Sequence, residues 1–463
     1  MTAISFNDVL IIGLVAVAVP AVCGLWPALP VPGAVLEVIA GIVIGPSILG
    51  WVHVDTAVQV LSDLGLGMLL FLAGLEIDVQ RLRGPLGRLA GAAFAVSAAL
   101  GLLCAFGLGL AGLASQPLFL AIVLISTSAG LLLPLLKDAH QEGSTFGQLV
   151  MTAAAIAEVV PILLLSLLFS AAAKTPEQRI ASLATFLLLL VAVGLALGRM
   201  RRLESLDRLL DRLGDQSAQL RVRAALTLAL AFGVLAYRFG FASILGAFAA
   251  GLLVRMMDLS GGRTPHPQFE TKMQGIGFGF LIPIFFIATG VQFDLPALLG
   301  HPAALAEVPL FLLALLVVRG LPALLYTRLL GSRLVPVAGL MQATTLTFVI
   351  VASQVGLATQ HISAATSASL LTAGLLSAAV FPAVATRLLA RDRRPAGTPS
   401  PDGPAEMGGR SATGTPGGQA PARHLLPPWH GVNDARGNVW AAITRFASHP
   451  LRRSGGQDRG SPK

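Results

Sequence analysis

A single carboxylate interrupts one of the most apolar stretches of the chain. Residues 153–165 read AAAIAEVVPILLL, and Glu158 is the only charged residue among them. A charged group inside an apolar segment is costly unless a partner or water stabilises it. Because one carboxylate can take up either a proton or a cation, Glu158 is a candidate site at which the two compete. With either one bound, the group is neutral and can cross an apolar barrier.

A second lone charge lies far away along the chain. The segment LFLLALLVVRGLPALLYTRLL carries Arg319 near its middle, followed by Gly320 and Pro322. Arg319 is therefore the candidate partner of Glu158, since an ionisable residue inside an apolar span needs one. On chemistry alone, a static salt bridge between two helices and a transport site remain equally consistent with this pair.

Hydroxyl side chains interrupt a third apolar segment, LAIVLISTSAGLLLPLLKD. Ser126, Thr127 and Ser128 precede Gly130, and Pro134 follows. Glycine and proline weaken a helix, and small hydroxyls can satisfy the backbone groups that are freed. In a membrane, unwound backbone is tolerated where protein buries it or where it lines a cavity. The alternative is an ordinary helix whose serines bond back to the preceding turn.

A similar polar cluster interrupts the segment VAGLMQATTLTFVIVASQVG, at Gln342, Thr344 and Thr345, with Thr347 close behind. These residues and the serine cluster are the expected lining of two broken helices.

The composition indicates what positions these residues. The chain has 463 residues, of which 55% are hydrophobic and 12% are charged, and its mean hydropathy is +0.78. Soluble domains carry about 25% charged residues. We therefore expect an all-α polytopic membrane protein with about thirteen spans. The expected spans are 7–25, 31–50, 57–76, 89–113, 116–136, 147–172, 180–198, 222–238, 241–256, 274–295, 303–326, 335–358 and 364–389.

The basic residues predict the orientation of these spans. Nearly all of them fall in one set of alternate loops, whereas the opposite set holds only Lys174, Arg179 and Arg238. By the positive-inside rule, the N-terminus lies outside and the C-terminus lies in the cytoplasm. This distribution also explains the net charge of +9 without a nucleic-acid partner. The expected location is the plasma (inner) membrane of a bacterium, and the expected partner is the lipid bilayer.

The order of the spans predicts an internal repeat. Repeat one covers about 7–172, a connecting helix covers about 180–198, and repeat two covers about 222–389, so a single connecting helix inverts the second unit. Each polar cluster then lies in the fifth span of its repeat. Interrupted helices at corresponding positions of inverted halves indicate a transporter site. These spans form one transmembrane exchanger domain, 1–390, and the Pro-, Gly- and Ser-rich segment 391–463 is expected to be a disordered cytoplasmic tail.

Four stretches resemble the second branch of the monovalent cation:proton antiporter family. They are LPVPGAVLEVIAGIVIGPSILG (29–50), LSDLGLGMLLFLAGLEIDVQRLR (61–83), GFASILGAFAAGLLV (240–254) and PIFFIATGVQFDL (283–295). The resemblance covers roughly residues 10–390. It implies two crossed broken helices, a mobile core beside a scaffold that forms a homodimer, and elevator-type exchange of Na⁺ or K⁺ for H⁺ with no further cofactor.

The resemblance also assigns residues. Glu158 falls where family members have the essential ion-binding aspartate, so this chain has Glu in place of Asp there. Thr127 falls in the first broken helix, and Arg319 falls where a lysine or arginine lies close to the ion site. Many relatives have a polar residue at the position of Ala157. Because this chain has no polar side chain at that position, the transported cation and the stoichiometry stay open.

Two other functions are also consistent with the sequence. One is a channel-like K⁺ efflux system, with gating by an unknown cytoplasmic regulator, and the other is a transport-inactive membrane sensor. An enzyme is not expected, because no nucleophile–base pair or metal cluster stands out. Coupled exchange, uncoupled conductance or neither would separate the three possibilities in sealed vesicles.

Overall fold

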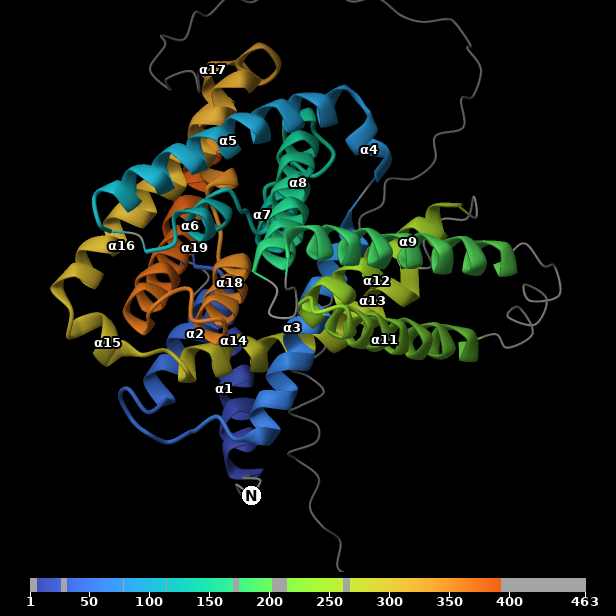
Figure 1. Cartoon of the computed structure of the whole chain (residues 1–463), viewed down its shortest axis with the longest axis horizontal. Coiled ribbons are helices and arrows are strands. Elements are labelled where there is room, and N and C mark those ends of the chain that lie inside the picture. Colours follow the sequence, from blue (N-terminus) through green and yellow to red (C-terminus); the bar gives the residue numbers. More distant parts are fainter. Residues whose placement is uncertain are drawn as a thin grey trace, which may run out of the picture. The chain divides into compact units, whose positions relative to one another are not determined.

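The computed structural model describes residues 6–25, 31–77, 79–113, 115–169, 175–201, 215–260 and 267–392. Every regular element in these ranges is helical (Figure 1), so the all-α prediction is confirmed for the described chain. The predicted tail lies outside these ranges from residue 393 onward.

Nine helices among the described residues are long and apolar enough to cross a membrane. Three shorter apolar helices accompany them, and the continuous stretch Pro302–Ala358 contains two of the expected spans. The helices before the middle of the chain are α1 (Phe6–Leu25), α2 (Gly33–Ile44), α3 (Thr56–Glu76), α4 (Val79–Arg83), α5 (Pro85–Leu110), α6 (Pro117–Leu124), α7 (Ala129–Asp138), α8 (Thr145–Leu168) and α9 (Pro176–Arg201). The later helices are α11 (Asp215–Arg238), α12 (Ser243–Ser260), α13 (Pro267–Ile276), η1 (Gly277–Leu281), α14 (Ile282–Val291), α15 (Leu295–Leu299), α16 (Pro302–Leu315), η2 (Leu316–Gly320), η3 (Leu321–Tyr326), α17 (Thr327–Gln342), α18 (Thr347–Ala358) and α19 (Ala364–Asp392).

The second predicted span, 31–50, is too long. Helix α2 ends at Ile44, and residues 45–50 form turns. Pro46 has no N–H with which to continue the helix, and Gly50 has a φ of 64°, which favours glycine. The apolar composition of this stretch therefore concealed a helix end.

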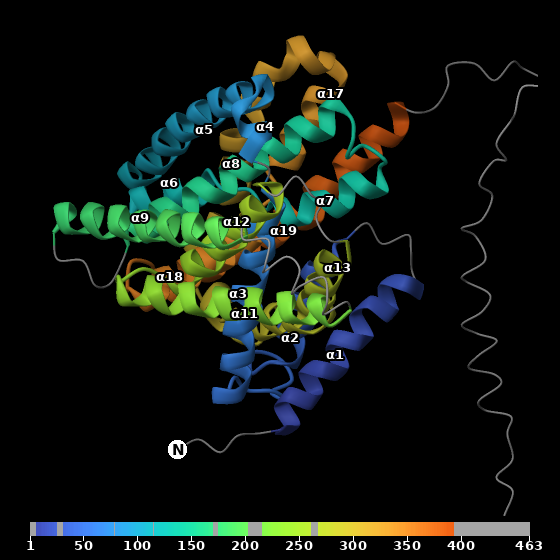
Figure 2. The ribbon, with the colours of Figure 1, turned by 90° about the vertical axis from the view of Figure 1, so that its right-hand side faces the viewer.

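Helices α9, α11 and α12 form a group that contacts the rest of the bundle mainly through α3 (Figures 1 and 2). Small residues make this contact possible. A Cβ at Gly74 of α3 would overlap the backbone of α12, and a Cβ at Gly251 of α12 would overlap the backbone of α3. The two helices thus touch backbone to backbone, which is the usual result of small residues at a membrane helix interface.

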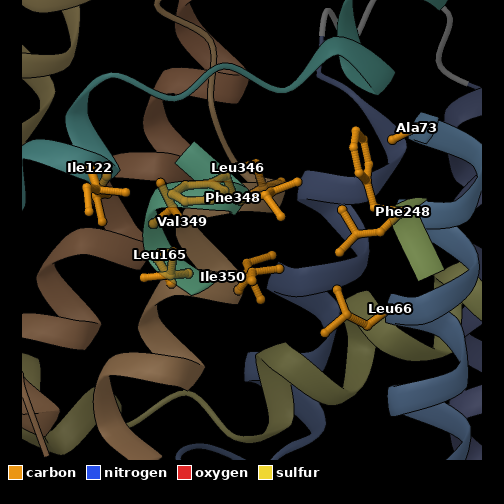
Figure 3. Close-up of a cluster of buried hydrophobic side chains, with 14 of the residues drawn as sticks. Leu66, Ala73, Ile122, Leu165, Phe248, Leu346, Phe348, Val349 and Ile350 are labelled. Atoms are coloured by element: carbon orange, nitrogen blue, oxygen red, sulfur yellow. The ribbon is translucent and has the colours of Figure 1, made fainter. Parts of the chain in front are cut away.

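Apolar side chains fill the space around α18. Figure 3 shows Ile350 of α18 between Leu165 of α8 and Leu66 of α3, and all three belong to one buried cluster. Ile122 of α6 and Phe248 of α12 extend the same cluster to either side. This packing holds the interrupted helices in place.

The helix that carries Arg319 is irregular where that residue lies. A π-helical turn, η2, follows α16 and contains Arg319, and the 3₁₀ turn η3 follows it. Pro322 cannot donate to the carbonyl of Val318, so the regular ladder is broken at this point. The chain then bends at Gly331, whose φ is 72°, before α17 continues. The irregular turns place a charged side chain inside the bundle.

Candidate functional site

The predicted break in the serine-rich segment is present. Helix α6 ends at Leu124 and α7 begins at Ala129, with no helical residue between them. Ser126, Thr127 and Ser128 are 0–1% exposed. Their backbone groups must therefore find partners inside the protein.

The second predicted break lies between α17 and α18. Helix α17 ends at Gln342 and α18 begins at Thr347. Gln342, Thr344 and Thr345 are all at most 1% exposed. Both polar clusters found in the sequence thus mark unwound, buried backbone.

The two unwound segments meet and satisfy each other's hydrogen bonds. The N–H of Ser128 donates to the carbonyl of Thr344 at 3.1 Å, and the hydroxyls of Ser126 and Thr345 lie 3.0 Å apart. The Ser128 hydroxyl oxygen also accepts from the backbone N–H groups of Leu346 and Thr347, at 3.0 and 3.1 Å. Ser128 therefore caps the N-terminus of α18 from the other interrupted helix, which provides partners that α18 alone lacks.

The unwound segments 125–128 and 343–346 meet at what we call the crossing. A serine of α19 supports the crossing, and the sequence did not predict this role. The N–H of Thr345 donates to the Ser377 hydroxyl at 3.1 Å, and that hydroxyl lies 2.7 Å from the Thr345 carbonyl. Ser377 is fully buried. A lone serine in an apolar helix usually bonds back to its own turn, so the sequence held no signal for this contact.

Helix α8 contributes a carboxylate and a backbone carbonyl that is freed from its regular helical hydrogen bond. Pro161 has no N–H for the carbonyl of Ala157, four residues earlier. That carbonyl accepts instead from the N–H of Thr127 at 3.2 Å. The next residue, Glu158, is 4% exposed, and its carboxylate accepts from the backbone N–H of Ala129, the first residue of α7. A helix N-terminus favours a negative charge at this position.

Glu158 lines a cavity of about 510 Å³. The cavity also contacts Thr347 at the start of α18 and Gly130 in the first turn of α7. Three further carboxylates line it, namely those of Glu37, Glu76 and Asp138. Glu158 thus shares one cavity with three other acidic side chains.

Arg319 lies at the crossing but does not line this cavity. It is 1% exposed. Its Nε donates to the Thr127 hydroxyl at 2.8 Å, and its Nη1 donates to the hydroxyl of Ser97 on α5 at 2.9 Å. The Thr127 hydroxyl in turn donates to the carbonyl of Gln342, the last residue of α17. A cation near the C-terminus of a helix is favoured by the helix dipole.

The expected ion pair between Arg319 and Glu158 is not formed within the described residues. Arg319 is instead held by hydroxyls and by Phe94, whose ring centroid is 5.9 Å from the guanidinium carbon. The unwound segment brings the Thr127 hydroxyl within reach of the guanidinium, whereas Glu158 faces the cavity. The static salt bridge is therefore not the arrangement seen here.

Three buried polar groups near Arg319 lack a hydrogen-bond partner in the described chain: its own Nη2, the hydroxyl of Tyr326 and the side-chain amide of Gln342. Each is at most 1% exposed. The interior around Arg319 is thus polar, although none of these three residues lines the cavity.

Comparison with known proteins identifies the family. Residues 13–391 match the model of the family described as "Sodium/hydrogen exchanger, transmembrane". The chain belongs to this family. It is accordingly an integral membrane protein of a transporter family and not an enzyme.

Individual sodium/hydrogen exchanger relatives agree with this assignment. The chain is 30% identical over 382 residues to the putative Na⁺/H⁺ antiporter YjbQ of Bacillus subtilis, covering 79% of this chain and 60% of the relative. It is 26% identical to the Na⁺/H⁺-K⁺ antiporter GerN of Bacillus cereus, covering 56% of this chain and 65% of the relative. The chain therefore spans less than two thirds of the length of these relatives.

The fold is similar to that of a solved exchanger, the sodium proton antiporter MjNhaP1 from Methanocaldococcus jannaschii. The TM-score is 0.57 at 16% identity, covering 83% of this chain and 98% of that chain. The likeness extends to almost the whole of that protein.

Proposed function

We propose that the chain is a secondary antiporter that exchanges a monovalent cation, Na⁺ or K⁺, for H⁺, with Glu158 as the shared site. One observation carries this proposal: the carboxylate of Glu158 is almost fully buried, yet it lines a cavity beside two interrupted helices. Family membership and the names of the relatives support the same activity.

The exchange follows from competition for one carboxylate. A proton or a cation neutralises Glu158, whereas the bare carboxylate resists transfer away from water. If only the neutral forms cross, each cation carried one way requires a proton carried the other way. Arg319 stays at the carboxyl ends of the helix fragments and acts as a fixed charge throughout, with Thr127 holding it. This division of roles is consistent with the lack of a direct Arg319–Glu158 pair.

The finer architecture belongs to the same proposal. We infer two inverted repeats, 7–172 and 222–389, joined by the helix at 180–198, and an elevator-type movement of the core beside a scaffold that forms a homodimer. The N-terminus would lie outside and the C-terminus in the cytoplasm. The cavity is lined by Glu76 at the end of α3 and by Asp138 at the end of α7. Both ends lie on the side of the basic loops, so the cavity faces the cytoplasm.

The test is proton-coupled cation flux in proteoliposomes, with Na⁺, K⁺ and Li⁺ compared. Glu158→Gln keeps the side-chain shape but cannot release a proton, so it should abolish exchange at every pH while the protein still folds. Glu158→Asp should retain part of the activity. Exchange that persists in Glu158→Gln would contradict the assignment. Cation flux without proton movement would favour a channel-like system, and the absence of any flux would favour a sensor.

A further inference from the structure

Thr347 occupies a special position beside Glu158. It is the first residue of α18 and is 7% exposed, and it lines the same cavity as Glu158. Its backbone N–H donates to the Ser128 hydroxyl. Its own hydroxyl makes no hydrogen bond within the described chain. Thr347 is thus a mostly buried residue at a cavity wall whose hydroxyl still lacks a partner in the described chain.

The hydroxyls of the other three threonines at the crossing already have hydrogen-bond partners. The Thr127 hydroxyl accepts from Arg319 and donates to a backbone carbonyl. The Thr344 hydroxyl donates to the carbonyl of Leu340 in α17 at 3.1 Å, and the Thr345 hydroxyl pairs with that of Ser126. None of these three residues lines the cavity.

A backbone oxygen completes the surroundings. Gly130 lines the cavity, and its carbonyl would normally accept from the N–H four residues later. That residue is Pro134, which has no N–H. The Gly130 carbonyl thus lacks its regular partner in α7. Alkali cations are hard ions that prefer carboxylate, hydroxyl and carbonyl oxygens.

We propose that Thr347 is a ligand of the transported cation and helps to set cation selectivity, together with the carboxylate of Glu158 and the carbonyl of Gly130. This inference rests on the proposed function, because it needs Glu158 as the site. It assigns the cation to oxygens from α7, α8 and α18. When the core moves, all three would have to keep their positions relative to one another. Thr127 then holds Arg319 and is not the hydroxyl that meets the ion.

The test compares matched variants in proteoliposomes. Thr347→Val has the same shape without the hydroxyl, and Thr347→Ser keeps the hydroxyl. We expect Thr347→Val to raise the KM for the cation about tenfold, to change the ratio of rates for Na⁺, K⁺ and Li⁺, and to leave the maximal rate nearly unchanged. Thr347→Ser should behave much like the wild type. Thr372→Val is the control, because Thr372 bonds within α19 and lies outside the cavity.

A second variant tests the carbonyl independently. Pro134→Ala restores an N–H that competes with the cation for the Gly130 carbonyl, so the KM should also rise, by about twofold to fivefold. Cation-induced thermal stabilisation of the purified protein provides a readout without transport. This stabilisation should weaken in Thr347→Val and Pro134→Ala. If either variant transports too poorly for a KM to be measured, the loss of stabilisation decides the test.

The outcomes separate this inference from the proposed function. A KM and selectivity in Thr347→Val equal to those of the wild type would overturn the role of Thr347, even if Glu158→Gln is inactive. An equal rise of KM in Thr347→Val and Thr372→Val would overturn it as well. Exchange that persists in Glu158→Gln would instead remove the proposed site itself.

Discussion

Glu158 and Arg319 occupy opposite electrostatic ends of the helix fragments that meet in the bundle. The carboxylate lies at the amino end of α7 and borders a cavity of about 510 Å³. The guanidinium reaches the carboxyl end of α17 through Thr127, and it borders no part of that cavity. The same dipole rule stabilises both charges, yet only Glu158 borders the cavity.

A lone charge inside the bundle is therefore stabilised in two different ways. Arg319 has two fixed hydrogen bonds to hydroxyls and an aromatic neighbour, which suits a charge that never changes. Glu158 has a cavity on one side, which suits a charge that is neutralised and regenerated.

Among changes outside Glu158 itself, removal of the fixed charge on Arg319 should have the largest effect. Arg319→Met keeps most of the side-chain length but leaves Thr127 and Ser97 without their donor, so exchange should fall by at least about tenfold, which corresponds to about 1.4 kcal/mol. Arg319→Lys should be intermediate, because an ammonium group cannot reproduce the guanidinium fork. The measurement is proton-coupled flux beside the amount of folded protein. If Arg319→Met only lowers the amount of folded protein, Arg319 stabilises the fold and has no separate role in transport. The difference between Arg319 and Glu158 would then be one of stability.

A weaker version of the same experiment removes only one support. Ser97→Ala deletes the acceptor of Arg319 Nη1, and a buried hydrogen-bonding group left unpaired costs about 1–3 kcal/mol. We expect a lower thermal midpoint and a several-fold slower exchange, with little change in the KM for the cation. Ser97→Thr and Ser97→Val form a matched pair, of which only the first retains the hydroxyl. Equal behaviour of this pair would show that packing, and not the hydrogen bond, holds Arg319.

The smallest effect among these three changes is expected at Pro161, one turn after Glu158. Pro161→Ala returns an N–H to the Ala157 carbonyl, which then has two donors competing for it. Exchange should fall by about twofold to threefold, since one backbone contact is worth about 0.5–1.5 kcal/mol. Pro309→Ala, on an exposed position of α16, is the control and should leave exchange unchanged. An effect of the same size in both variants would mean that helix stiffness matters more than the freed carbonyl.

Part of the site could be predicted because its signals are local. Glu158 and Arg319 stand out as lone charges in apolar segments, and the serine and threonine clusters with nearby glycine or proline predict the two interruptions that the structure contains. These inferences need only the spacing of one segment.

Other parts could not be predicted, because their cause lies between distant segments. Nothing in α5 or α19 marks Ser97 or Ser377 as partners of the crossing. The four threonines near the two breaks look alike in sequence, and only the folded chain leaves the hydroxyl of Thr347 beside the cavity. Opposite charges predicted an Arg319–Glu158 pair, but nearby hydroxyls hold the guanidinium instead.

Hydropathy and proline chemistry act over a few residues, so a membrane protein of many helices, its two breaks and the charges beside them could be read from local segments. Local segments do not reveal which of the two charges borders the cavity. That choice depends on which faces of α7, α8 and α18 border the cavity, and it arises from packing between segments that are far apart along the chain.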